Sequence, residues 1–249
     1  MSRGLIRLLK TTGIILALAW SSWAASPADE TVLEFVRATR VQRGRVAYLV
    51  DVTISASLPA LHKAGVLRAV KKQLPAGRAA YQTLLYDGDG LVKNNVIARY
   101  LSAELEAHRP EEILATEISL LNYRFSLKGR DTVAGRETLV YEVKPLRKRA
   151  GLFRGTVWLD RETALPLKEQ GRLDKLPSVW LKEILFTREY KLVNGYAVPL
   201  RIESVVNTRI VGKAEINIDF DNYRFEEPAR LDTVSAEGSN GLSESLLPR

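Results

Sequence analysis

The sequence predicts a mainly antiparallel β fold: a curved half-barrel sheet of about 10–11 strands, covered by roughly two or three helices. Between Asn122 and Gly171, short runs alternate apolar with polar residues, and no helical period appears. Tight-turn sequences such as Gly129-Arg130-Asp131 and Asn194-Gly195 separate the runs. Apolar stripes of helical period occur before this stretch. Short strands with one apolar face are typical of a meander that helices cover on one side.

The N-terminal part of this domain opens with a predicted helix at 29–40. Val32, Phe35 and Val36 follow the acidic pair Asp29-Glu30 at helical spacing. Segment 66–74 suits a strand or a helix, and the turn Pro75-Ala76-Gly77 favours a strand paired with 78–86. The other elements expected here are a strand at 46–58, a turn at 62–65 and a turn at 87–90.

Two helices are predicted in the middle of the chain. Apolar residues form one helical stripe from Val96 to Leu105, and this helix is expected to end before Pro110. Pro110 suits the first position of a second helix, with acidic residues in its first turn and apolar positions to Leu121. Placed between β segments, both helices suit a cover over one face of the sheet.

The C-terminal part is predicted to consist of strands only. The strands expected after Asn122 are 123–127, 139–143, 156–159, 165–167, 179–193, 196–206 and 214–220, with a loop at 171–178. Asn194-Gly195 is a strong hairpin sequence. The last strand alternates cleanly, so one of its faces is expected to meet a core or a cavity and the other to meet water.

Both ends of the chain are predicted to lie outside this domain. Residues 1–24 read as a secretory signal peptide, with Arg3, Arg7 and Lys10 before a short apolar run and Ser22-Trp23-Ala24 at the cleavage site. An uncleaved anchor is the alternative, although the run is short for a membrane span. The half-barrel domain is expected at 25–227, and a disordered tail rich in Ser, Glu and Gly at 228–249.

Composition limits the chemistry. There is no cysteine, which excludes disulfides, thiolate metal sites and a lipidated N-terminal cysteine. Only His62 and His108 are present, both in turn-like contexts typical of solvated residues, so we expect no metal, no cofactor and no enzyme activity. The net charge of +8 favours an anionic partner such as a membrane surface over nucleic acid, although it also serves solubility alone. Neither the ligand nor the oligomeric state follows from these features.

Two candidate sites emerge from the pattern. The apolar strand faces predict a hydrophobic groove, and its candidate residues are Trp158, Trp180, Ile184, Phe186, Ile216 and Phe220. The basic rim loop comprises Arg147, Lys148, Arg149 and Arg154, which flank the apolar pair Leu152-Phe153 and suit an anionic membrane surface. The alternative is a solvated hairpin loop whose Phe153 packs back onto the domain.

Several segments resemble the LolA/LolB-like family of exported proteins, which includes RseB-like envelope-stress sensors. The similar segments are Asn122-Tyr123-Arg124-Phe125, Gly135-Arg136, Leu139 to Val143, Val157 to Asp160, Leu165-Pro166 and Asn194 to Pro199. The resemblance implies a periplasmic carrier or binding protein for a lipid or lipoprotein acyl chain. An envelope interaction or stress-sensing module is the alternative, and a hydrolase lacks a nucleophile-base set. No functional residue of the family is carried over.

Overall fold

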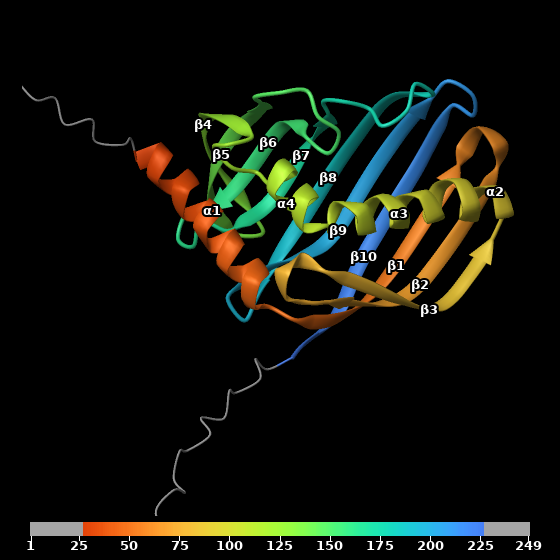
Figure 1. The fold of residues 1–249 in the computed structure, drawn as a ribbon, viewed down its shortest axis with the longest axis horizontal. Helices are drawn as coiled ribbons and strands as arrows, with labels where there is room; N and C mark the ends of the chain where they lie inside the picture. The colour runs from red at the N-terminus through yellow and green to blue at the C-terminus, as the bar shows by residue number, and fades with distance from the viewer. Residues whose placement is uncertain (1–26, 227–249) are drawn as a thin grey trace, which may run out of the picture.

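The computed structural model describes residues 27–226, and these form one antiparallel sheet with helices on one face (Figure 1). The order of its ten strands is β3-β2-β1-β10-β9-β8-β7-β6-β5-β4. The strands are β1 (Tyr48–Leu58), β2 (Lys63–Gln73), β3 (Ala79–Gly88), β4 (Tyr123–Val133), β5 (Arg136–Pro145), β6 (Phe153–Asp160), β7 (Pro166–Leu173), β8 (Leu181–Val193), β9 (Tyr196–Thr208) and β10 (Lys213–Phe225). The predicted fold class is therefore confirmed. The predicted signal peptide and C-terminal tail lie outside the described residues.

Pairing between the first and the last strand completes the sheet. β4 to β10 follow one another as a meander, and β3, β2 and β1 form a second one. β1 pairs with β10 along its length, with Ile54 opposite Ile218. The predicted hairpin at Asn194-Gly195 joins β8 to β9, and both residues have positive φ, 52° and 79°. That conformation is the reason why Asn and Gly suit a two-residue turn.

Helix α1 (Pro27–Arg45) precedes the sheet and is longer than predicted. Its apolar stripe buries Val32 and Phe35, which are 1% and 2% exposed. The far end of the helix is held by Gln42, whose side-chain amide exchanges two hydrogen bonds with the backbone of Ala197 in β9, at 2.6 and 3.0 Å. Burial of one stripe and this amide contact fix the helix beside the sheet.

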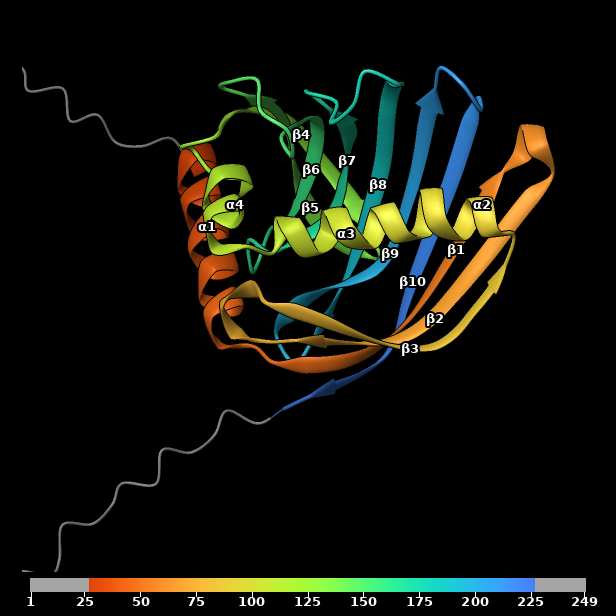
Figure 2. The same cartoon turned by 45° about the vertical axis from the view of Figure 1, so that its right-hand side comes forward.

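A second helical segment crosses the concave face of the sheet (Figure 2). It consists of α2 (Gly90–Val92), a π-helical turn (Lys93–Ile97) and α3 (Ala98–Ala107). Asp89 caps its start by accepting a hydrogen bond from the backbone N–H of Leu91 at 2.8 Å. Val92 and Ile97 are fully buried, whereas Leu105 is 44% exposed. The predicted apolar stripe therefore packs on the sheet only in its first part.

The predicted turn at Gly129-Arg130-Asp131 is wrong. These residues lie inside β4, which continues to Val133 because it stays paired with β5, and only its register shifts between Leu127 and Gly129. The chain reverses at Ala134-Gly135, where both residues have positive φ.

Other predicted boundaries also differ from the structure. Helix α4 (Pro110–Thr116) ends before the apolar residues at 118–121, because Asn122 binds the carbonyls at its end. β2 begins at Lys63, since a 3-10 turn at Pro59–Leu61 already reverses the chain. β7 continues to Leu173 because Phe153 of β6 still pairs with that residue.

The buried side chains form two separate apolar clusters. The first lies under α2 and α3 and is built from β1, β2, β9 and β10, with Val52, Ile54 and Ile218 nearly inaccessible. The second joins α1 to β4–β8 and contains Phe35, Tyr141 and other apolar residues. The concave face is therefore packed near both ends of the sheet.

Candidate ligand-binding cavity

A cavity of about 560 Å³ lies between the concave face of the sheet and the helices. Its walls come from α1, α3, α4, the β5–β6 loop, the β7–β8 loop and the strands β6–β8. The residues that line it include Phe35, Val36, Ala103, Thr116, Ile118, Gly151, Phe153, Glu169, Pro177, Phe186, Arg188 and Tyr190. The cavity thus lies beside the second apolar cluster, under the C-terminal part of α3.

The wall of the cavity is apolar where α1, β6 and β8 turn their apolar side chains inward, whereas α3 and α4 add the polar residues Glu106, Glu112 and Thr116. Phe35 and Val36 come from the buried stripe of α1. Phe153 and Phe186 come from the inner faces of β6 and β8, and their rings meet edge to face with centroids 5.0 Å apart. Such aromatic contacts keep the wall rigid without filling the cavity.

A polar cluster interrupts the sheet side of this wall. Glu169 of β7 is 4% exposed and faces two side chains of β8. Its Oε2 lies 3.3 Å from Nη1 of Arg188, and its Oε1 accepts a hydrogen bond from the hydroxyl of Tyr190 at 3.0 Å. The Arg188 guanidinium also lies over the ring of Phe186, 4.9 Å from its centroid. We call Glu169, Arg188 and Tyr190 the polar floor.

The surroundings of Arg188 and Tyr190 in the polar floor raise the pKa of both side chains. Burial works against the charge of Arg188, but Glu169 outweighs it and raises the pKa of the guanidinium. Burial, with the Glu169 carboxylate adding to it, raises the pKa of the Tyr190 hydroxyl well above its ordinary value. Arg188 therefore stays charged and Tyr190 stays a neutral donor at physiological pH. The floor offers a paired guanidinium rather than a titrating acid or base.

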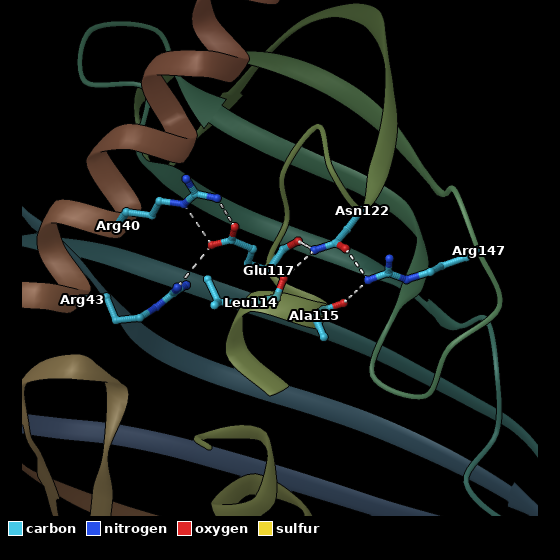
Figure 3. Close-up of polar contacts among 7 residues, drawn as sticks. All are labelled: Arg40, Arg43, Leu114, Ala115, Glu117, Asn122 and Arg147. Atoms are coloured by element: carbon cyan, nitrogen blue, oxygen red, sulfur yellow. Dashed lines mark hydrogen bonds and ion pairs between the residues drawn. The ribbon is translucent and has the colours of Figure 1, made fainter. Parts of the chain in front are cut away.

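Helix α4 is fastened to α1 through Glu117, just beyond its end (Figure 3). The Glu117 carboxylate is 5% exposed and lies between Arg40 and Arg43. Nε of Arg40 donates to it at 3.2 Å, the Nη2 of Arg40 makes a second contact, and Nη1 of Arg43 lies at 3.4 Å. Burial opposes the ionisation of Glu117, yet the two guanidiniums prevail and lower its pKa. This contact closes the cavity between α1 and α4.

Asn122 organises the chain between α4 and β4 (Figure 3). Its side chain is buried and donates hydrogen bonds to the carbonyls of Leu114 and Glu117, each at 3.0 Å. Its Oδ1 accepts a hydrogen bond from Arg147 at 2.9 Å, and the same Arg147 nitrogen lies 3.4 Å from the carbonyl oxygen of Ala115. The buried amide therefore caps α4 and ties it to the β5–β6 loop.

Helix α3 is fastened to the opposite part of the sheet by a buried ion pair. Nζ of Lys71 in β2 lies 2.6 Å from Oε1 of Glu104, and the hydroxyl of Tyr81 in β3 donates to the other carboxylate oxygen. Nδ1 of His108 lies 2.6 Å from the Glu104 carbonyl. Burial favours the neutral form of Glu104, but Lys71 and Tyr81 prevail and lower its pKa. The pair holds the helical cover over the cavity.

The sequence predicts a solvated His108, but in the structure this residue is half-buried. It follows the last residue of α3, where the backbone N–H of His108 and its ring both contact the Glu104 carbonyl. His62 is exposed, as predicted. His108 lies near Lys71 of β2 and Arg43 of α1, two residues that are distant in the sequence.

The structure separates the six predicted groove residues. Phe186 lines the cavity. Ile216 and Phe220 are buried in the cluster under α2 and α3, and Ile184 lies on the same face of β8 as Phe186 without lining the cavity. Trp180 precedes β8 and is 59% exposed.

Trp158 lies on the convex face of the sheet and does not line the cavity. Its neighbours Val157 and Leu159 are fully buried, so strand alternation turns Trp158 outward. The indole Nε1 donates to Asp131 at 3.0 Å, and Nζ of Lys168 lies over the indole ring at 5.4 Å. Strand alternation predicts that Trp158 lies on the opposite face of β6 from Val157 and Leu159. Which of the two faces is concave depends on the curvature of the whole sheet.

The basic rim loop is largely engaged with the domain. Arg149 pairs with Glu112 of α4 at 2.7 Å, and Arg154 pairs with Asp174. Arg147 binds Asn122, and Lys148 is exposed. Leu152 and Phe153 are buried, so Phe153 packs back onto the domain as the alternative reading proposed. The loop therefore presents fewer unpaired cations and no exposed Leu-Phe pair.

Sequence reasoning did not find the polar floor, although one sign of it was present. Arg188 alternates in step with Ile184, Phe186 and Tyr190, so all four side chains lie on the same face of β8. The strand therefore places a cation on its apolar face. A cation in such a position requires a partner. The identity of that partner, Glu169, follows only from the register of β7 against β8.

Within residues 27–226, no group of three or more His, Cys, Asp or Glu side chains could hold a metal ion. In the same part of the chain, no helix is both long enough and apolar enough to span a membrane.

The family model of the MucB/RseB N-terminal domain matches residues 92–174. This match begins in the helical cover and ends after β7, so it includes α3, α4 and part of the cavity wall. The predicted resemblance is confirmed. Over residues 92–174, the chain is similar to the MucB/RseB N-terminal domain.

Solved structures with similar chains have low sequence identity. A putative outer membrane lipoprotein-sorting protein domain from Vibrio parahaemolyticus is 15% identical with a TM-score of 0.44, over 80% of this chain and 93% of that one. A DUF1329 family protein from Desulfovibrio piger is 14% identical with a TM-score of 0.42, over 81% and 94%. The Pseudomonas aeruginosa MucA/MucB complex contains a chain that is 13% identical with a TM-score of 0.29, over 77% and 93%. No curated protein matches the chain.

Proposed function

We propose that the protein binds an acyl chain of a lipid or lipoprotein in the cavity and carries it in the periplasm. The observation that carries this proposal is the cavity of about 560 Å³ beside the second apolar cluster, which supplies Phe35, Phe153 and Phe186 to its wall. Its size falls within the roughly 300–1,000 Å³ range of small-molecule sites. Each methylene buried against such walls contributes about 0.8 kcal/mol.

The polar floor is compatible with an apolar occupant. An acyl chain that covered an unpaired Arg188 would bury an isolated charge, which is costly. The contacts of Glu169 with Arg188 and Tyr190 satisfy these groups before a ligand arrives. Covering the cluster then costs less, and its remaining donors can meet a polar group of the ligand.

A fluorescent fatty-acid probe tests the proposal. Ala103 lines the cavity from α3, so Ala103→Trp is expected to obstruct it and to weaken probe binding by at least about tenfold, since an indole displaces several methylenes. Ala80→Trp, on an exposed position of β3, is the matched control and is expected to leave binding unchanged. Absence of probe binding at micromolar protein, or equal loss in both variants, would refute an acyl-chain site.

Export is the second part of the proposal. The n-region, apolar run and Ser22-Trp23-Ala24 support removal of residues 1–24 and release into the periplasm. N-terminal sequencing of the protein from a periplasmic extract is expected to begin at Ala25. A chain that stays in the membrane fraction with Met1 intact would contradict release.

A second candidate function is an envelope interaction module that binds a protein. The match of residues 92–174 to the MucB/RseB model favours it, and MucB has been solved in complex with MucA. Crosslinking in cells, followed by native mass spectrometry of the purified protein, separates the candidates. A module predicts one crosslinked protein and no bound lipid, whereas a carrier predicts co-purified lipid.

A further inference from the structure

Several connections that lie far apart in the sequence gather at one end of the strands of the sheet. Adjacent strands are antiparallel, so every second connection falls at the same end. Four of these segments are 117–122, 146–152, 174–180 and 209–212, and the loops before β6, β8 and β10 follow the upper side of the sheet in Figure 1. We call these four segments the apolar rim.

The apolar rim exposes large hydrophobic side chains at the tips of its loops. Their exposed fractions are 73% for Leu121, 54% for Leu146, 79% for Val179, 59% for Trp180 and 71% for Ile210. Single exposed apolar residues are common on protein surfaces, whereas several at the tips of neighbouring loops point to a contact surface. Val179 and Leu121 are the most exposed large hydrophobic side chains of the described residues.

Backbone contacts hold these tips next to one another. Arg209 donates from its backbone N–H to the carbonyl of Trp180 and from Nε to the carbonyl of Val179, each at 2.9 Å. Ile210 therefore lies beside that pair. At the other part of the rim, the N–H of Leu146 donates to the carbonyl of Asn122 at 2.9 Å, which brings Leu121 and Leu146 together.

The charges of the apolar rim are positive. Its cations are Arg147, Arg149, Lys148, Lys175 and Arg209, of which only Arg149 forms an ion pair within residues 27–226. Its carboxylates are neutralised: Glu117 is buried between Arg40 and Arg43, and Asp174 pairs with Arg154. The exposed tips are thus flanked by cations that no rim carboxylate offsets.

We propose that the apolar rim is a docking surface for an anionic lipid bilayer. Apolar tips flanked by cations match the headgroup region and the acyl region of one membrane leaflet. The apolar side chains enter the boundary of the acyl region, while the cations meet the headgroups. Trp180 suits this position because an indole favours the membrane interface. This surface includes Arg147, Lys148 and Arg149 of the predicted basic rim loop and adds the apolar loop tips on the β7–β8 and β9–β10 connections.

The same loops contribute to the wall of the cavity. Ala150 and Gly151 line it from the β5–β6 loop, and Pro177 lines it from the β7–β8 loop, two residues before Val179. Docking at the apolar rim would bring this part of the cavity wall near the bilayer. Membrane contact here would not require an occupied cavity, so it can be tested separately from acyl-chain binding.

Flotation with vesicles tests the apolar tips. The full chain is mixed with vesicles of 3:1 phosphatidylcholine and phosphatidylglycerol, or of phosphatidylcholine alone, in roughly 0.05 M and 0.5 M salt. Binding is expected to anionic vesicles at low salt and to weaken at high salt. The variant Val179→Ser/Trp180→Ser/Ile210→Ser is expected to lose at least about tenfold in binding, whereas the control Leu33→Ser/Leu84→Ser/Leu85→Ser, exposed elsewhere, is expected to match the parent.

A second measurement uses the unaltered surface. Brominated acyl chains are expected to quench the fluorescence of Trp180, measured as the difference between the parent and Trp180→Phe, which retains the other three of the four tryptophans. Lys148→Gln/Lys175→Gln is expected to weaken binding about tenfold, and the equally charged control Lys72→Gln/Lys128→Gln is not. Absence of vesicle binding, the same affinity in the rim and control variants, or no quenching of Trp180 overturns the assignment. If the apolar rim docks on a protein instead of a bilayer, no vesicle binding is expected.

Discussion

At the scale of single residues, Asp160 shows how one buried carboxylate fixes a turn. It is 1% exposed at the end of β6 and accepts two hydrogen bonds from Arg136, at 2.7 and 2.9 Å. The backbone N–H and the hydroxyl of Thr163 donate to it as well. Burial alone would raise the pKa of Asp160, but Arg136 and Thr163 lower it. These contacts close the β6–β7 turn beside the second apolar cluster.

Arg136 provides a matched pair of variants. Asp160→Ala removes the buried partner and is expected to lower the free energy of unfolding by about 3 kcal/mol, because it leaves donors unsatisfied. Glu162→Ala removes the partner of the same Arg136 that is 81% exposed, and is expected to cost less than about 1 kcal/mol. Urea unfolding of both variants checks this order. Equal costs would mean that burial does not decide the strength of these ion pairs.

His108 gives a prediction for acid pH. Burial and the nearby Lys71 lower its pKa below 6.5, outweighing the Glu104 contacts, and Arg43 adds to the lowering. The unfolded chain therefore binds more protons at mildly acid pH, and stability that is complete above 6.5 is lost as the pH falls through the folded-state pKa. We expect His108→Gln to reduce the loss of unfolding free energy between about pH 7 and pH 5. Identical pH slopes for both proteins would contradict this.

The limits of sequence reasoning at this scale are visible in the basic rim loop. Its cations were predicted to face a membrane, yet Arg149 finds Glu112, 37 residues away in α4. Local sequence contains no information on such a distant partner. The alternation of β6 did indicate that Trp158 is turned away from Val157 and Leu159, but not which side is concave.

At the scale of elements, the buried pair of Lys71 and Glu104 decides how α3 lies on the sheet. Both side chains are almost inaccessible, and Tyr81 completes the carboxylate's contacts. Glu104→Gln is expected to destabilise the protein by about 3–5 kcal/mol, because Lys71 would remain as a buried unpaired charge. Hydrogen exchange is expected to quicken first in residues 90–107.

The double variant Lys71→Met/Glu104→Met is the control for this prediction. It removes both charges and keeps apolar side chains of similar length, so most of the lost stability is expected to return. If the double variant is as unstable as Glu104→Gln, the shape of the contact, rather than its uncompensated charge, holds the helix.

The elements themselves were largely predictable from periodicity. Strand alternation, the Asn194-Gly195 hairpin and the stripe of α1 all appear in the structure. The end of α4 was not predictable, because a buried Asn122 caps it through tertiary contacts that also involve Arg147. The polar floor was missed for a similar reason, since the pairing of β7 with β8 brings Glu169 to Arg188.

At the scale of the whole molecule, the cavity lies between the curved sheet and its helices, beside the second apolar cluster. β1 and β10 join two meanders into one sheet, and each cluster fills one part of the concave face. A curved sheet with a helical cover was predicted from the sequence. The position of the cavity was not, because it depends on where α3 and α4 are fastened by Lys71 and Glu117.

The central claim is that this cavity takes an acyl chain, and photocrosslinking with a diazirine-labelled fatty acid tests it most directly. We expect labelled peptides from α1 and β8 that carry Phe35, Val36 and Phe186, and competition by unlabelled fatty acid. Labelling is expected to fall in Ala103→Trp and to persist in Ala80→Trp. Labelling confined to the convex face around Trp158, or none that unlabelled fatty acid competes away, would contradict the claim.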